Sequence, residues 1–384
     1  MLRERDIQVG VFVPPHHSNR ENVALAMRRD LELVNWLEEL GYSEFWLGEH
    51  HSGGFQIYGS PELFIAAAAE RTSRIKLGAA VISMPYHNPL IVADRIVQLD
   101  YQTRGRAMFG FGPGALSSDA HMLGIPVSES RDRMADGIDL VVRLLNGEVV
   151  TAQSDWYTLR DARLHLEPFT QPRPTLAVAS LKTPTGALTA ARYGMALLCA
   201  NAAGVKDARK IATDTAAEYG TTFDRSQIRV VGSFHLAETR EEALKQVKFG
   251  IDDYIEYLHV IRPPEPGKKE TAGETIEHIL SARGGVIGTP DDAVIALEKL
   301  WELTGGFGCL LLSGTNWMNF EATKRSYELF MRYVLPRFTG QNRRRESSLQ
   351  WMRDNAHDFS EIRDKAAEHA MIRSDKKHVH ADPN

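Results

Sequence analysis

The sequence predicts an α/β protein folded as a single (β/α)8 TIM barrel, on the strength of two observations. Eight short apolar or β-branched runs alternate with segments of helical periodicity between residue 7 and residue 338. The same unit repeats without a change in composition, and such barrels extend over about 250 residues or more as one domain. We therefore expect one barrel over residues 1–338 and a separate extension over residues 339–384.

The first two units carry the clearest signals. A strand is expected from Ile7 to Val13, and residues 21–40 repeat apolar side chains at helical spacing up to Gly41, a residue type that commonly ends helices. A second strand, from Ser43 to Gly48, precedes a helix that begins at Pro61, since proline is favoured in the first helical turn. These two units set the pattern for the rest of the chain.

The later units complete the count of eight. We expect the other strands at Ile75 to Ile82, Ala107 to Phe111, Thr175 to Ser180, Met195 to Ala200, Ile228 to Leu236 and Gly308 to Leu312. Helices are expected over residues 90–102, 128–146, 184–193, 205–219, 240–258 and 319–335. An extra helix is predicted from Thr289, because this capping threonine is followed by a proline and two aspartates.

Three segments depart from the repeat. Residues 151–173 alternate apolar and polar side chains, which predicts an inserted hairpin, and residues 262–287 are rich in proline and glycine, which predicts a long loop. If this loop follows a strand, it lies over the carboxyl-terminal mouth of the barrel as a lid. The polar extension is expected to be disordered or to wrap a second subunit, because His378 and His380 alone make a weak metal site.

Composition and charge exclude several classes of function. The chain carries 50 acidic against 45 basic side chains and no long basic run, which argues against nucleic acid as a partner. No window approaches the roughly 18 apolar residues of a membrane span, and the charged amino terminus is unlike a signal peptide. Cys199 and Cys309 lie inside apolar runs, as core residues do. We expect a soluble cytoplasmic protein that binds neither nucleic acid nor membrane.

The end of the second strand holds the best candidates for catalysis, because barrel active sites are built at the carboxyl ends of strands. Gly48 is followed there by Glu49, His50 and His51, which combine a carboxylate with imidazoles that titrate near neutral pH. Adjacent residues of an extended chain point to opposite sides, so only one histidine can face the axis and no metal site is expected. Histidines held only by structural hydrogen bonds remain the alternative.

Small residues and hydroxyls mark two further strand ends. Gly78, Ala79 and Ala80 leave room for a flat group or for barrel packing, and the glycine-dense turn around Gly112 lets a ligand approach the main chain. Pro113 in that turn is incompatible with a dinucleotide-binding fingerprint. The fifth strand leads into a helix start with hydroxyl groups and a lysine, which predicts an anion site or a plain helix cap; its residues are Ser180, Lys182, Thr183, Thr185 and Gly186.

In this order the motifs resemble the bacterial luciferase-like flavin-dependent monooxygenase family, and within it the limonene monooxygenase-like members. The resemblance covers most of residues 7–338; its stretches are Leu40 to His51, Ile75 to Pro85, Pro85 to Pro89, Arg106 to Gly114, residues 175–194 and Val286 to Pro290. It implies a barrel, usually dimeric, that takes reduced FMN from a separate flavin reductase. It also implies that the flavin reacts with O2 to give a C(4a)-peroxyflavin.

The resemblance assigns roles to individual residues. His50 matches the family's catalytic histidine, and Glu49 and His51 flank it. Ala80 and Val81, beside Ala79, match the place of a non-prolyl cis peptide against the flavin ring. The phosphate loop of the flavin corresponds to Ser180, Thr183, Thr185 and Gly186. Bacterial luciferase has cysteine and arginine where this chain has Gly112 and Pro113, so Lys182 is the expected substitute for the arginine and light emission is not expected.

The leading hypothesis is an FMNH2-dependent two-component monooxygenase that inserts one oxygen atom from O2 into an apolar substrate of the terpene, aldehyde or ketone class. His50 would manage the proton. The alternatives are a deazaflavin-dependent hydride-transfer oxidoreductase and a non-catalytic flavin-binding protein. A homodimer is expected by family analogy. Candidate pocket residues are Val11, Phe12, His16, Phe55, Tyr58, Met84, His87 and Met122.

Overall fold

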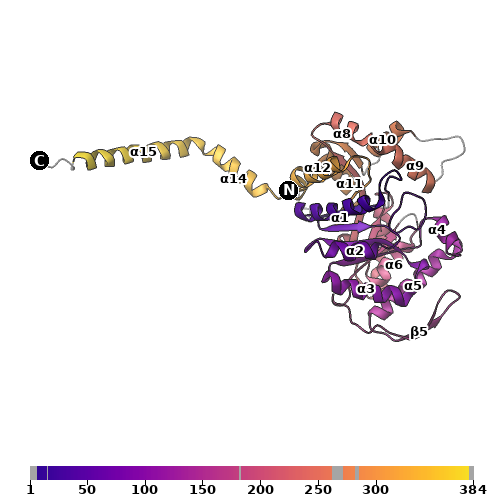
Figure 1. Ribbon diagram of the computed structural model, residues 1–384. Helices are drawn as coiled ribbons and strands as arrows, with labels where there is room; N and C mark the ends of the chain where they lie inside the picture. Colours follow the sequence, from indigo (N-terminus) through magenta and orange to yellow (C-terminus); the bar gives the residue numbers. More distant parts are fainter. Residues whose placement is uncertain (1–6, 15, 181–182, 262–270, 282–284, 380–384) are drawn as a thin grey trace. The chain divides into compact units, whose positions relative to one another are not determined.

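The computed structural model describes residues 7–14, 16–180, 183–261, 271–281 and 285–379. The chain forms two compact units, of which the larger spans Arg5–Phe338 and the smaller includes Thr339–Asn384. Every strand among the described residues belongs to the larger unit (Figure 1). The smaller one is helical over the described residues.

Eight parallel strands close into a barrel, which confirms the predicted fold. Their order around the barrel is β9, β11, β1, β2, β3, β4, β7 and β8, and β8 pairs again with β9. The strands are β1 (Gln8–Val13), β2 (Glu44–Leu47), β3 (Lys76–Ser83), β4 (Ala107–Gly112), β7 (Thr175–Ser180), β8 (Ala196–Cys199), β9 (Ile228–Leu236) and β11 (Cys309–Ser313). Each overlaps one of the eight strands that periodicity predicts.

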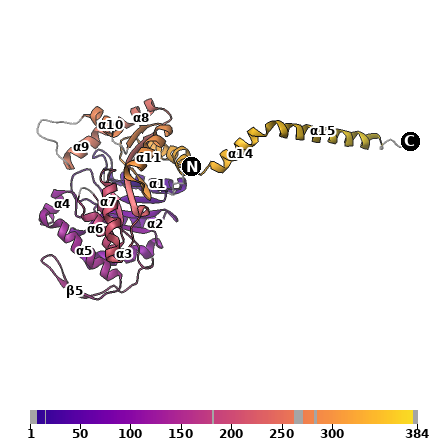
Figure 2. The same cartoon turned by 180° about the vertical axis from the view of Figure 1, so that it is seen from behind.

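Helices surround the strands on the outside (Figures 1 and 2). They are α1 (Val23–Leu40), α2 (Pro61–Ala69), α3 (Pro89–Thr103), α4 (Ser117–Met122), α5 (Ser130–Leu145), α6 (Thr185–Tyr193), α7 (Val205–Ala216), α8 (Arg240–Val247), α9 (Ile251–Ile261), α11 (Pro290–Thr304) and α12 (Phe320–Leu329). Local signals explain their ends, since the Asn22 side chain accepts the Leu25 N–H and Gly41 takes a φ of 87° at the end of α1.

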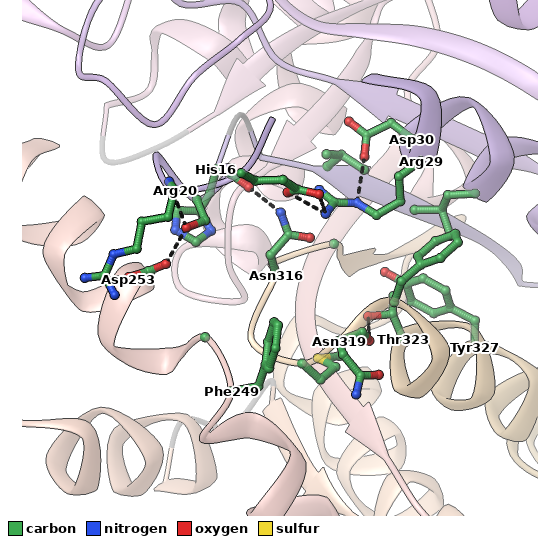
Figure 3. Close-up of a pocket in the computed structure, with 18 residues that line it drawn as sticks. His16, Arg20, Arg29, Asp30, Phe249, Asp253, Asn316, Asn319, Thr323 and Tyr327 are labelled. Carbon is green, nitrogen blue, oxygen red and sulfur yellow. Dashed lines mark hydrogen bonds and ion pairs between the residues drawn. The ribbon is translucent and has the colours of Figure 1, made fainter. Parts of the chain in front are cut away.

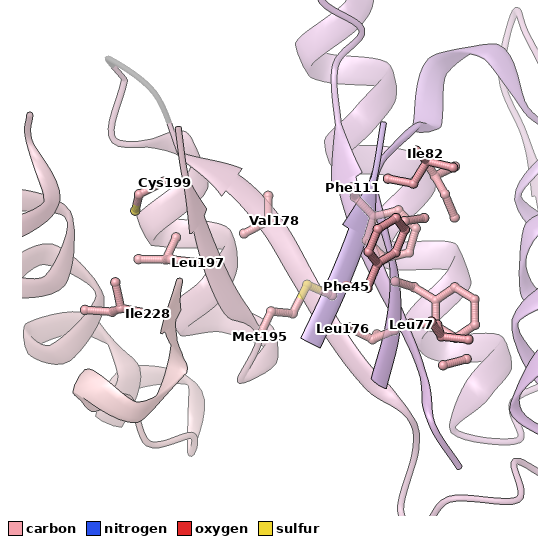
Figure 4. Close-up of a cluster of buried hydrophobic side chains, with 14 of the residues drawn as sticks. Phe45, Leu77, Ile82, Phe111, Leu176, Val178, Met195, Leu197, Cys199 and Ile228 are labelled. Carbon is pink, nitrogen blue, oxygen red and sulfur yellow. The ribbon is translucent and has the colours of Figure 1, made fainter. Parts of the chain in front are cut away.

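Alternate residues of each strand face two different cores. In β2, Phe45 and Leu47 pack outward against helices, whereas Trp46 points into the barrel with Met108 and Leu311. Figure 4 shows part of the outer core, where side chains of neighbouring strands gather. Burying one such side chain contributes about 1.5–3 kcal/mol, so the strand-to-helix layer is the main source of stability.

The amino-terminal end of the barrel interior is filled. A Cβ at Gly78 would lie 2.2 Å from the ring of Trp46, so a glycine is needed opposite that indole. Glu44 accepts hydrogen bonds from Trp46 Nε1 at 2.8 Å and from Arg229 Nη2 at 2.9 Å. Higher in the barrel, interior side chains such as Ala80 and Val81 are partly exposed. The interior side chains are therefore less completely buried toward the carboxyl-terminal mouth.

The prediction of an inserted hairpin is confirmed, and the prediction of a long loop is wrong in part. Strands β5 (Val150–Gln153) and β6 (Thr158–Ala162) pair antiparallel. Within the expected loop over residues 262–287 lie helix α10 (Ala272–Ser281) and strand β10 (Gly285–Gly288), which pairs with β9. A four-residue strand with glycine at both ends shows no periodicity, which explains the error. Residues 262–270 and 282–284 lie outside the described residues.

The carboxyl-terminal unit is helical where it is described. It contains helices α14 (Arg343–Asp354) and α15 (Ala356–Val379), so the disorder expected there is wrong over the described residues. The alternative, that this extension wraps a second subunit, stays a prediction. His380 and the side chain of His378 lie outside the described residues. In the described part of the chain, no helix is both long and apolar enough to cross a bilayer.

Candidate active site

The loop between β2 and α2 carries the predicted catalytic residues at the barrel mouth. Glu49, His50 and His51 follow closely after the strand. The backbone carbonyl of Tyr58, at the other end of the loop, accepts the backbone N–H of His50 at 3.2 Å. The carboxyl ends of β3 and β4 lie beside this loop, because β2 pairs with β3 and β3 with β4. The strand pairing therefore brings side chains of three successive units together.

Glu49 is a buried anchor for two imidazoles. Its Oε1 accepts hydrogen bonds from His51 Nε2 and His87 Nε2, each at 2.9 Å, and its Oε2 accepts the Ser83 N–H at 2.9 Å. Burial favours a higher pKa for Glu49, but the hydrogen bonds from His51 and His87 outweigh it and lower the pKa to about 2. Glu49 is therefore a permanent carboxylate that orients side chains and does not transfer protons.

His51 contacts both Glu49 and Tyr86. The hydrogen bond to Glu49 raises the pKa of His51, although partial burial opposes it. The rings of His51 and Tyr86 meet edge to face at 5.9 Å. Burial, with the charges of Asp119 and Glu49, raises the pKa of Tyr86 to about 12, so this hydroxyl stays protonated. A Cβ at Gly114 would lie 2.2 Å from the Tyr86 hydroxyl, which explains a glycine in the turn after β4.

His50 is held by a different carboxylate. Its Nδ1 lies 3.2 Å from Oδ2 of Asp119, which is 1% exposed on α4. Burial lowers the pKa of His50, with the Asp119 hydrogen bond opposing, so the ring is neutral at pH 7. Because a carboxylate only accepts, Nδ1 carries the ring proton and Nε2 is left with a free lone pair. This arrangement prepares Nε2 to accept a proton.

Asp119 and His87 are the site residues whose roles the sequence did not reveal. Asp119 follows Ser117 and Ser118 at a helix start, where such residues usually cap the helix. Its second oxygen accepts a hydrogen bond from Ser52 Oγ at 2.5 Å. The sequence marks His87 only as a candidate pocket residue. Their roles depend on hydrogen bonds between side chains that follow different strands. A single sequence carries no signal of such contacts.

The three residues expected against a flavin ring, Ala79, Ala80 and Val81, do not all point to the same side of β3. The Ala80–Val81 peptide bond is cis, and both side chains pack on the interior cluster. The Ala79 side chain instead faces the outer core, and only its carbonyl lies on the inner side, near Gly110. A Cβ at Gly112 would lie 2.4 Å from Val81 Cγ2, so this glycine makes room for Val81.

The start of α6 has the features of an anion site. Ser180 ends β7 and is buried, and a Cβ at Gly186 would lie 2.6 Å from the Ala179 carbonyl oxygen, so this glycine allows close helix-to-strand packing. Among the described residues no side chain caps the helix at Pro184, and its first turn has no acid. The free N–H groups and the helix dipole favour an anion there. Thr183 is exposed and Thr185 half-buried. Lys182 lies outside the described residues.

The candidate pocket residues divide into two groups. Phe12, His16, Phe55 and His87 lie on the inner side or around the mouth. Val11, Tyr58 and Met84 instead pack into the outer core, and Met122 is 59% exposed on α4. Strand alternation explains Val11, whose neighbour Phe12 faces the interior.

Comparisons with known proteins agree with this geometry. The family model of luciferase-like monooxygenases matches residues 7–306. The chain is 44% identical over 340 residues to limonene 1,2-monooxygenase of Rhodococcus erythropolis, covering 87% of each chain. It is 42% identical over 360 residues to 4-hydroxyprotoasukamycin monooxygenase of Streptomyces nodosus subsp. asukaensis, covering 91% of this chain and 97% of that one.

A solved structure shares the fold. It is the oxygenating constituent of 3,6-diketocamphane monooxygenase from Pseudomonas putida in complex with FMN, with a TM-score of 0.73 and 19% identity over 86% of this chain and 98% of that chain. The barrel, the family match over residues 7–306 and the two relatives above 40% identity lead to one conclusion. The chain belongs to the luciferase-like monooxygenase family.

Proposed function

We propose that the protein is an FMN-dependent monooxygenase that inserts one atom of O2 into an organic substrate, with reduced FMN delivered by a separate flavin reductase. The observation that carries this proposal is the neutral His50, oriented by Asp119 at the mouth of the barrel. Two relatives above 40% identity across most of the chain are both named monooxygenases, which favours oxygenation over hydride transfer to or from a deazaflavin.

The residues at the mouth fit a flavin mononucleotide. Small, partly exposed side chains at Ala80 and Val81 leave an apolar surface for a flat ring, and the uncapped start of α6 offers N–H groups to a phosphate. Ser180, Thr183, Thr185 and Gly186 are the residues that we assign to the phosphate end. When bound, reduced FMN supplies the electrons that activate O2.

The protein's own contribution is proton handling and orientation. His50 Nε2 accepts a proton and can return it, and the carboxylate of Asp119 stabilises the imidazolium that forms in between. Glu49 keeps His51 and His87 in fixed orientations beside it. The low pKa of Glu49 prevents this carboxylate from competing for the same proton.

We also propose a homodimer that works in the cytoplasm. Helix α2 packs against α3 and still exposes 75% of Leu63, and Ile91 on α3 is 44% exposed. Exposed apolar side chains on two neighbouring helices are suited to contact with a second copy of the same chain. Cys199 and Cys309 are both free and buried, as in a reducing compartment. Sedimentation of the wild type and of Leu63→Glu tests the dimer, which the charge should dissociate.

The function is tested with photoreduced FMN, O2 and a panel of terpenes, aldehydes and ketones. Wild-type protein should convert at least one of them to a product with one added oxygen atom. His50→Ala should lose about 10²-fold or more in turnover while binding FMN with little change, because the imidazole acts on protons and does not hold the phosphate. Normal turnover of this variant at saturating flavin would contradict the role of His50.

A further inference from the structure

A buried carboxylate, Asp30, lies in the middle of α1. It is 3% exposed, and the other buried residues of this helix are all apolar: Ala26, Leu33, Val34 and Leu37. A carboxylate in such surroundings is costly unless charges and hydrogen bonds compensate it. Its Oδ1 lies 3.8 Å from Nε of Arg29, which is a long ion pair (Figure 3). The closer contacts of Asp30 are made by its other oxygen.

Oδ2 of Asp30 joins α1 to two loops at the carboxyl ends of the strands. It accepts a hydrogen bond from the Tyr58 hydroxyl at 2.9 Å and lies 2.7 Å from Nε2 of His17. Tyr58 belongs to the loop between β2 and α2, and His17 to the loop after β1. Because a carboxylate only accepts, Nε2 of His17 carries a proton and donates it to Asp30.

Tyr58 connects Asp30 to the proposed catalytic histidine. Its backbone carbonyl accepts the backbone N–H of His50 at 3.2 Å. Its side chain points the other way, into the outer core, where the ring meets Phe64 edge to face at 5.2 Å. The main chain of Tyr58 therefore holds His50, and its hydroxyl is held by Asp30.

His17 gives a second connection to the same loop. Its backbone N–H donates to the carbonyl of Phe55 at 2.7 Å, and its ring meets that of Tyr58 edge to face at 5.6 Å. The loop covers residues 48–60 and contains neither helix nor strand, so its order depends on such contacts. Asp30 therefore fixes this loop at Phe55 and at Tyr58.

We propose that Asp30 is a positioning residue for His50. Its bonds to Tyr58 and His17 hold the β2–α2 loop in place, and the fixed loop keeps the imidazole on Asp119. The proposal rests on the monooxygenase function proposed above and adds a residue of α1 to its machinery. The hydrogen bond from His50 to Asp119 is 3.2 Å long, so a shift of the loop by about 1 Å would break it, and such displacements cost up to about 100-fold in rate.

Hydrogen exchange of the full-length protein tests the positioning without any reaction. Tyr58→Phe keeps the ring and its contact with Phe64 but removes the hydrogen bond to Asp30. The amides of residues 48–60 should exchange at least about tenfold faster in Tyr58→Phe and in Asp30→Asn than in the wild type. Wild-type exchange of this loop in Tyr58→Phe would overturn the proposal, and this variant decides the question if Asp30→Asn does not fold.

Asp100→Asn is the matched control. Asp100 is also a fully buried carboxylate, and it accepts hydrogen bonds from the N–H and the hydroxyl of Thr170, each at 2.7 Å. It lies near the end of α3, shortly before β4 begins, and therefore at the opposite end of the barrel from the mouth. The variant should leave the exchange of residues 48–60 and the kcat of the folded protein unchanged. Equal acceleration of this loop in Asp100→Asn would show a general loosening of the barrel and would overturn the proposal.

A double-mutant cycle with Asp119 separates positioning from a purely structural role. Tyr58→Phe should lower kcat about tenfold and change the FMN dissociation constant less than about threefold. In an Asp119→Asn background the imidazole has already lost its orientation, so Tyr58→Phe should cost less than about twofold in kcat. Unchanged kcat in Tyr58→Phe, or losses that multiply in the double variant, would overturn the positioning role.

Loop exchange and oxygenation can fail separately. If residues 48–60 loosen in Tyr58→Phe and no product of the wild type gains oxygen, the proposed function is wrong and Asp30 still positions the loop. If the wild type oxygenates a substrate and Tyr58→Phe changes neither kcat nor loop exchange, the function stands and this proposal is wrong.

Discussion

The Nδ1 atom of His50 lies 3.2 Å from Oδ2 of Asp119, and the other oxygen of that carboxylate accepts a hydrogen bond from Ser52. Asp119 thereby fixes both the ring orientation and the tautomer of His50, with Nε2 left free. Glu49 does the same for His51 and His87 through a single oxygen. Two buried carboxylates, Asp119 and Glu49, therefore orient different histidine side chains at the mouth of the barrel.

Replacing Asp119 with asparagine should impair catalysis more than binding. The amide keeps the shape but neither fixes the tautomer nor stabilises a charged imidazole, so turnover should fall by about 10- to 100-fold. The FMN dissociation constant should change less than about threefold, since nothing assigns Asp119 to the cofactor. Steady-state kinetics and flavin titration measure the two effects. The exposed Asp132, changed to asparagine, is the control, and equal kinetics of the two variants would rule out the role of Asp119.

The pH dependence of kcat/KM should report the His50 ring. Burial lowers the pKa of His50 below its usual value of 6.5, so activity should rise with pH along a limb that lies below about pH 6.5. The Asp119 hydrogen bond raises this pKa, so Asp119→Asn should move the limb to still lower pH. Kinetics between pH 4 and pH 8 measure the limb. A shift to higher pH in the variant would contradict the assigned pair.

Glu49→Gln should destabilise the fold near neutral pH. The pKa of Glu49 is lowered to about 2 in the folded protein, so its ionised form contributes stability above the unfolded value of 4.5. That contribution is lost as the pH falls from 4.5 to about 2, because the unfolded chain then takes up the proton first. Urea unfolding at pH 7 should show a loss of about 2–4 kcal/mol.

The control for Glu49 is Glu39→Gln on the exposed side of α1. Its stability should match the wild type within about 0.5 kcal/mol. The difference between Glu49→Gln and the wild type should also shrink as the pH is lowered. A gap that is constant from pH 7 to pH 3 would show that the carboxylate charge is not what stabilises the site.

Gly186→Ala should weaken FMN binding. The new Cβ would lie 2.6 Å from the Ala179 carbonyl oxygen, so the start of α6 must move away from β7. We expect FMN affinity to fall about tenfold or more and stability to fall by about 1–3 kcal/mol. Gly273→Ala in α10 is the control, because its Cβ meets no atom closer than 3.9 Å. Unchanged flavin affinity in Gly186→Ala would exclude this helix start as the phosphate site.

Local patterns predicted most of the fold, and tertiary contacts decided the rest. All eight barrel strands follow from apolar runs between turn residues, but the single helix expected over residues 240–258 is divided into α8 and α9. A Cβ at Gly250 would lie 2.0 Å from the Asn316 carbonyl oxygen, and the Gly250 N–H donates to Trp317 at 2.7 Å. That break depends on a distant loop, which periodicity cannot show.

In the candidate site, too, local patterns predict some residues and tertiary contacts decide the others. His50 and Glu49 could be predicted because they follow a strand directly, at the end where barrel active sites lie. Asp119 could not, because its partner is 69 positions away and its own neighbours suggest only a helix cap. Ala79 was expected on the flavin side, but its side chain faces the outer core. Exact strand register decides such details, and the sequence does not encode it locally.

The fate of O2 is the measurement to make first. The protein is mixed with photoreduced FMN, carveol or limonene, and isotopically heavy oxygen gas, and the product is analysed by mass spectrometry. We expect a product that carries one labelled oxygen atom per molecule and that nearly disappears with Asp119→Asn. The proposed oxygenase would be contradicted if the substrate gained no labelled oxygen, if FMN were oxidised as fast as it is without protein, and if turnover occurred only with a reduced deazaflavin.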